Sequence, residues 1–97
     1  MEVNFSGTVT SEPSYFFGTH TKAEHEEFGL QTAAGPLEVI DNVDLAPPVP
    51  VHTGDRIDVQ GEMVHDPGKP PIVHWTHHDP AHRHEDGFIR FQGKVYA

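Results

Sequence analysis

The stretch Val3–Thr10 reads VNFSGTVT and alternates apolar and polar side chains with the two-residue period of a half-buried β-strand. Val3, Phe5 and Val9 fall on one face of this strand, and the intervening polar side chains fall on the other. Gly7 interrupts the pattern, and a glycine inside a strand is typical of a bulge or of the sharp bend that a small barrel needs at its corners. This first segment therefore predicts a strand of a barrel.

Several later segments share this patterning and are bounded by turn-forming residues: 28–32, 37–40, 56–64, 72–76, 88–91 and 94–96. Three prolines in the stretch 41–50 predict an extended, non-helical crossing. The pattern favours an all-β fold, a small five-stranded Greek-key OB-like barrel with a C-terminal β-hairpin extension. A sandwich of this length would need about seven strands.

The remaining segment, residues 11–26, is polar and is predicted to be one long connection. Residues 22–27 at its end are compatible with a single helical turn, too short to be a helix. Its aromatic triplet, Tyr15-Phe16-Phe17, is predicted to be a hydrophobic plug beneath the connection.

The length of 97 residues predicts a single OB-like domain, 1–97, in which 1–76 form the barrel and 77–97 a histidine-rich loop and the terminal hairpin. No cysteine is present, which excludes disulfides and thiolate chemistry. No apolar run approaches the roughly 20 residues that span a bilayer, so no membrane association is expected. Because Met1 leads directly into strand-like sequence, the expected location is cytoplasmic.

The charge balance is acidic, with 15 Asp and Glu residues against 6 Lys and Arg, a formal net charge of −9. Such a field repels phosphate backbones and argues against nucleic acid as a partner. The sequence also contains nine histidines, so its charge depends on pH wherever histidine titrates. The oligomeric state stays open.

A histidine cluster near the C-terminus is the strongest chemical signal, since five of the nine histidines fall within eleven residues: His74, His77, His78, His82 and His84. Imidazole and carboxylate groups together are usual ligands of zinc or another divalent transition metal. We predict a metal site built from His77, His78 and His84, with Asp79 as a ligand or as the acceptor that orients an imidazole. Alternatively, Asp79 caps its turn and the histidines are solvated, because no diagnostic spacing such as HExxH occurs.

Three further residues are candidates that a barrel could bring near the cluster: His25, Asp44 and His74. Trp75 is a core or rim aromatic, or a ligand-binding residue if its ring is free to stack on a base. Four functions stay open: a binding module for a metal or small ligand, a small metal-dependent hydrolase or phosphodiesterase, a single-stranded nucleic-acid-binding OB module, or a purely structural histidine network. No catalytic residue can be assigned.

The sequence resembles DUF3465, a bacterial domain family of unknown function. The resemblance extends from about residue 3 onward and rests above all on the heptapeptide HWTHHDP at 74–80; the other matching positions are His25, Phe28, 42–47, Gly54-Asp55, Gly61-Glu62, His84, Gly87, Gly93 and Tyr96. The resemblance implies an OB-type barrel, and a common site at His25, Asp44, His77, His78, Asp79 and His84. It transfers no activity. Family members that begin with a leader segment imply a periplasmic or exported location as the alternative.

Overall fold

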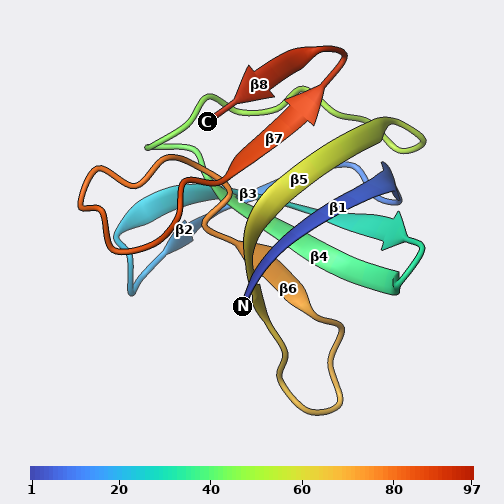
Figure 1. The fold of residues 1–97 in the computed structure, drawn as a ribbon, viewed down its shortest axis with the longest axis horizontal. Coiled ribbons are helices and arrows are strands. Elements are labelled where there is room, and N and C mark those ends of the chain that lie inside the picture. The colour runs from blue at the N-terminus through green and yellow to red at the C-terminus, as the bar shows by residue number, and fades with distance from the viewer.

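The computed structural model describes all residues, Met1–Ala97, and consists of eight β-strands without a helix (Figure 1). The strands are β1 (Glu2–Val9), β2 (Ser14–Gly18), β3 (Ala23–Thr32), β4 (Gly35–Asn42), β5 (Arg56–Val64), β6 (Ile72–His74), β7 (Phe88–Phe91) and β8 (Lys94–Tyr96). The chain therefore has no helix that is long and apolar enough to cross a membrane.

Five of the strands close into a barrel in the order β1-β3-β4-β6-β5, and the pairing of β5 with β1 completes the ring. All neighbours in this ring are antiparallel except β4 and β6, which run parallel. Strand β2 adds to β3 outside the ring, and the β7–β8 hairpin extends from β5. This topology confirms the predicted OB-like barrel with its terminal hairpin.

Gly7 lies where β1 turns from one neighbour to the other. It is in register with Ile57 on β5 and with Thr32 on β3, so both sides of the strand are paired at this residue. A Cβ atom here would lie 2.5 Å from the carbonyl oxygen of Gln31 and 2.8 Å from Leu30 Cγ. Only glycine permits this close approach at the barrel corner.

The alternating side chains predicted from the sequence fill the barrel interior. Val9, Val39, Val59 and Val73 are at most 1% exposed. The whole buried core consists of Val9, Phe28, Leu30, Leu37, Val39, Val49, Val51, Ile57, Val59, Val73, Ile89, Phe91 and Tyr96. Burying a side chain of this size contributes roughly 1.5–3 kcal/mol, so this core is the main source of stability in a chain without disulfides.

The segment 11–26 differs from its prediction. It holds strand β2 and the start of β3, joined by a tight turn in which the Lys22 N–H donates to the Gly18 carbonyl at 2.7 Å. The expected helical turn is absent because these residues continue the β3 ladder beyond the barrel. The aromatic triplet is not a plug either, since its three side chains are 39–59% exposed on β2. Sequence patterning missed β2 because it pairs with one neighbour only and covers no core.

Two boundaries also differ. The first hairpin connects its strands through Ala33 and Ala34 alone, because Gly35 and Pro36 already belong to β4. Strand β6 ends at His74 rather than at residue 76, because Trp75 adopts a left-handed conformation with φ of 55° and turns the chain away from the sheet. The histidine-rich loop starts at that turn.

Candidate functional site

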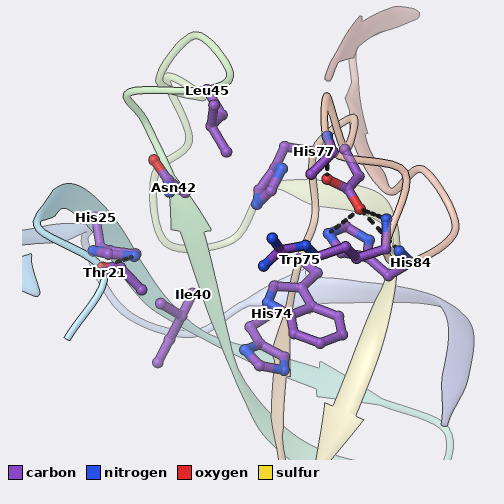
Figure 2. A pocket seen from close by; sticks show the side chains of 12 residues that line it. Thr21, His25, Ile40, Asn42, Leu45, His74, Trp75, His77 and His84 are labelled. Carbon is purple, nitrogen blue, oxygen red and sulfur yellow. Dashed lines mark hydrogen bonds and ion pairs between the residues drawn. The ribbon is translucent and has the colours of Figure 1, made fainter.

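A pocket of about 510 Å³ lies between the outer face of the sheet and the loop that follows β6 (Figure 2). Strands β3, β4 and β6 form its floor and residues 75–84 form one wall. The lining residues are Thr21, His25, Ile40, Asn42, Leu45, His74, Trp75, His77, Asp79, Ala81, Arg83 and His84. Four of the nine histidines thus face one space.

Strand alternation places the floor residues on the side opposite the core. Val39 and Asp41 point into the barrel, so Ile40 and Asn42 point outward. His25 is paired with Asn42 across the β3–β4 ladder and shares this outer face. Continuing the parallel pairing of Val39 with Val73 by one residue places His74 beside Ile40.

The base of the histidine loop is closed by Gly87. Its N–H donates to the His77 carbonyl at 2.9 Å. A Cβ atom at Gly87 would collide with the Trp75 carbonyl oxygen and lie 2.6 Å from that of Gln60. Only glycine lets the two ends of the loop approach each other and β5 this closely.

Asp79 organises the loop from within. Its carboxylate accepts hydrogen bonds from three backbone N–H groups, those of Ala81 at 2.9 Å, His84 at 2.8 Å and Arg83. Burial alone would raise the pKa of Asp79, but these donors together with nearby His84 hold it below its usual value. Asp79 therefore fixes the backbone that carries His84, as in the capping alternative drawn from the sequence, but His77 and His84 are not solvated as that alternative also expected.

Three aromatic rings form a continuous stack along the pocket wall. The Trp75 ring is stacked on His74 at 4.7 Å between centroids and on His84 at 4.4 Å, with interplanar angles of 16° and 12°. His77 meets His84 edge-on at 5.7 Å. Because an imidazole covers each face of Trp75, a nucleobase cannot stack there without displacing one of them.

Backbone carbonyls fix the orientation of two imidazoles. His77 donates its Nδ1–H to the His78 carbonyl at 2.6 Å, and His84 donates its Nδ1–H to the Glu85 carbonyl at 2.7 Å. A carbonyl oxygen can only accept, so the proton must reside on Nδ1, and the neutral ring keeps its lone pair on Nε2. The same second-atom hydrogen bond orients histidines that bind metals through Nε2.

Burial favours the neutral form of two imidazoles in the pocket wall, those of His74 and His77. It lowers the pKa of His77, and the positive charge that His84 gains on protonation lowers it further, against an opposing effect of the His78 carbonyl. Burial also lowers the pKa of His74, although Glu62 opposes this shift. Both imidazoles therefore stay unprotonated to lower pH than a free histidine, whose pKa is 6.5.

The structure brings together most of the residues singled out from the sequence, but not all. His25, His74, His77, Asp79 and His84 line the pocket. The exposed His78 does not line it, and the exposed Asp44 instead accepts a hydrogen bond from the Glu24 N–H at 3.0 Å. No group of three or more histidine, aspartate or glutamate side chains lies close enough to hold a metal ion. The protein offers at most two such ligands at one point.

Three polar residues behind the pocket were not identified from the sequence: Glu26, Asp41 and Thr76 are fully buried. Glu26 and Asp41 are opposite each other on β3 and β4, both pointing into the barrel. Glu26 accepts from the Val49 N–H at 2.9 Å and the Tyr15 hydroxyl at 3.1 Å. The sequence could have indicated Glu26 and Asp41, because each continues the core-facing positions of a strand in which buried and exposed residues alternate.

Fold and site together define a small OB-like barrel that carries a histidine-lined pocket on its outer surface. The sequence profile of the family described as "Protein of unknown function (DUF3465)" matches residues 15–97, so the chain belongs to this family. The match includes the heptapeptide 74–80 and every pocket residue, while β1 lies outside it. No curated protein matches the sequence.

Proposed function

We propose that this domain is a binding module whose pocket takes up one divalent transition metal ion through the Nε2 atoms of His77 and His84. The observation that carries the proposal is the pair of Nδ1–H hydrogen bonds to backbone carbonyls. They leave the lone pair on each Nε2 atom free. They also orient both rings before a metal binds, so less conformational entropy is lost on binding.

Electrostatics support a cation rather than an anion as the first occupant. The chain carries a formal charge of −9, and the Asp79 carboxylate lies 3.8 Å from His84 Nε2. Metal binding requires neutral imidazoles, and burial keeps His77 in that form. Neutral nitrogen ligands suit zinc, copper and nickel more than magnesium or calcium.

Two protein ligands leave coordination positions open, which is characteristic of sites that present a metal to a further ligand. Arg83 is the only lysine or arginine that lines the pocket, and its guanidinium suits an anionic group bound to the metal. The module thus binds a metal together with an acidic small ligand.

Zinc titration of untagged protein by isothermal calorimetry tests this proposal. We expect one ion per chain, and a loss of affinity of at least about tenfold in His77→Ala and in His84→Ala, since even loss of a group that only orients a ligand costs that much. His78→Ala and His82→Ala are matched controls, because both imidazoles are exposed and neither lines the pocket. Absence of zinc uptake, or equal losses in the controls, would overturn the proposal.

A further inference from the structure

Strand β2 has a free edge. All five of its residues pair with β3, and it pairs with no other strand. In an antiparallel ladder every second residue directs its N–H and C=O groups toward one neighbouring strand, and the residues between direct theirs to the other side. The backbone groups on the outer side of β2 are therefore available to a further strand.

The side chains of β2 are aromatic on both faces of the sheet. Phe16 pairs with His25, and its ring is stacked on that imidazole at 5.2 Å between centroids, on the same face as the histidine-lined pocket. Tyr15 and Phe17 point to the opposite face and are 54% and 59% exposed. An exposed apolar edge strand is a template for pairing with another chain.

The other free edge of the sheet, β8, is built differently. Strand β8 pairs only with β7, has three residues, and one of them is Lys94. Short edge strands and lysine side chains are common means by which proteins prevent edge-to-edge pairing. Strand β2 is longer and contains no charged residue. Of the two free edges, β2 is therefore the one suited to pairing.

The order of residues in β2 is self-complementary about Phe16. When two copies are aligned antiparallel with Phe16 opposite the partner's Phe16, each Tyr15 lies opposite the partner's Phe17. The same alignment places the small Ser14 opposite the partner's Gly18. Aromatic cross-strand pairs stabilise a sheet, and the two-fold symmetry forms each such pair twice. A second copy of the chain thus fits this edge.

The charges around β2 are compatible with this alignment. Glu12 precedes the strand, whereas His20 and Lys22 follow it, so antiparallel pairing brings ends of opposite charge together. The formal charge of −9 on each copy opposes association. At physiological ionic strength, however, exposed charges more than about 8 Å apart are largely screened. The net charge therefore weakens the pairing without preventing it.

We propose that two copies of this chain associate through β2, paired antiparallel about a two-fold axis at Phe16. The sheets of the two copies then continue into each other. Because the axis is perpendicular to the sheet, both histidine-lined pockets open on the same face of the dimer. The partner's Phe16 lies beside Phe16, at the rim of a hollow of about 400 Å³ that Phe16, His25 and Ile40 help to line. The association does not depend on the proposed metal site.

Sedimentation equilibrium of untagged protein, at concentrations up to about 1 mM, tests this proposal. We expect a reversible monomer–dimer equilibrium. Phe17→Lys should weaken it at least about tenfold, because the charge replaces one ring in both symmetry-related aromatic pairs. Val95→Lys, the matched change at an exposed apolar residue of β8, should leave the equilibrium unchanged. Equal weakening in both variants would overturn the proposal. A chain that stays monomeric throughout would also overturn it, and would leave the β2 edge to a strand of another protein.

Single cysteine variants locate the contact independently, because the sequence contains no cysteine. Phe16→Cys places the two sulfur atoms opposite each other at the axis and should give a disulfide-linked dimer under mild oxidation. In Ser14→Cys, which changes an exposed residue on the same face, the two cysteines lie roughly 14 Å apart along the strands and should not cross-link. Cross-linking of Ser14→Cys as fast as that of Phe16→Cys would contradict the proposed alignment.

Discussion

Thr76 donates its hydroxyl proton to Asp41 at 2.8 Å, which ties the start of the histidine loop to the interior of the barrel. Both side chains are fully buried. The second carboxylate oxygen of Asp41 has no hydrogen-bond partner, and Glu26 faces it from β3. The loop that carries His77 is therefore anchored on a buried acid.

This acid should make stability depend on pH. The pKa of Asp41 is raised from 3.8 to about 7, chiefly by burial, with the Thr76 hydrogen bond opposing this shift and the charge of Glu26 adding to it. Because the folded state holds this proton more tightly than the unfolded state, its stabilising contribution is complete below about pH 4 and is lost as the pH rises through 7. The contribution of Asp41 to the free energy of unfolding should therefore be lower at pH 8 than at pH 5, whereas His74 and His77, whose pKa values are lowered, contribute in the opposite direction.

Asp41→Asn should flatten this dependence, because the amide keeps an acceptor for Thr76 but does not titrate. Urea unfolding at pH 5 and pH 8 measures the effect, with Glu2→Gln as the control at an exposed position. Part of the dependence should persist in Asp41→Asn, because burial also raises the pKa of Glu26. Equal pH dependence in wild type and Asp41→Asn would refute this role of Asp41.

Replacing Asp79 should loosen the histidine loop more than it destabilises the barrel. Asp79→Ala leaves three backbone N–H groups without their acceptor, at a cost of about 2 kcal/mol. Fluorescence of Trp75, the only tryptophan, should change because His84 loses its support in the stack. Asp66→Ala, in an exposed turn, is the control, and an unchanged Trp75 spectrum in Asp79→Ala would contradict the assignment.

Gly87 and Gly93 should respond differently to alanine. At Gly87 the added Cβ collides with backbone atoms of Trp75 and Gln60, so we expect a loss of about 3 kcal/mol and an altered Trp75 spectrum. At Gly93 the space is open and only the positive φ of 78° is unfavourable, at about 1 kcal/mol. Thermal unfolding and fluorescence of both variants check this order. Equal losses, or a native spectrum in Gly87→Ala, would count against the close approach.

The alternation of apolar and polar residues was sufficient to predict the barrel. One side of each barrel strand faces the core, so apolar residues must recur at every second position. The β5 segment shows this clearly, since Ile57 and Val59 are buried between polar neighbours. Strand β2 was missed for the opposite reason: it has no core to cover, and Phe16 and Phe17 remain exposed on it. An edge strand of this kind is determined by pairing with β3, which local pattern does not reveal.

The candidate site was predicted in part. Spacing along the chain placed His77 and His84 in one loop. It could not show that the Asp79 carboxylate accepts hydrogen bonds from the backbone, or that His78 lies outside the pocket. Those outcomes depend on the path of the loop, which is determined by Gly87 and the left-handed Trp75. Asp41 could have been found as a charged residue on the buried face of β4.

The most direct test of the metal site is a long-range ¹H–¹⁵N NMR spectrum of the histidine side chains before and after one equivalent of zinc. Without zinc, His77 and His84 should carry their proton on Nδ1, as the hydrogen bonds to the His78 and Glu85 carbonyls require. With zinc, the Nε2 signals of these two residues should shift, while those of His78 and His82 stay in place. Unshifted Nε2 signals of His77 and His84, or shifts confined to the exposed histidines, would contradict the proposed site.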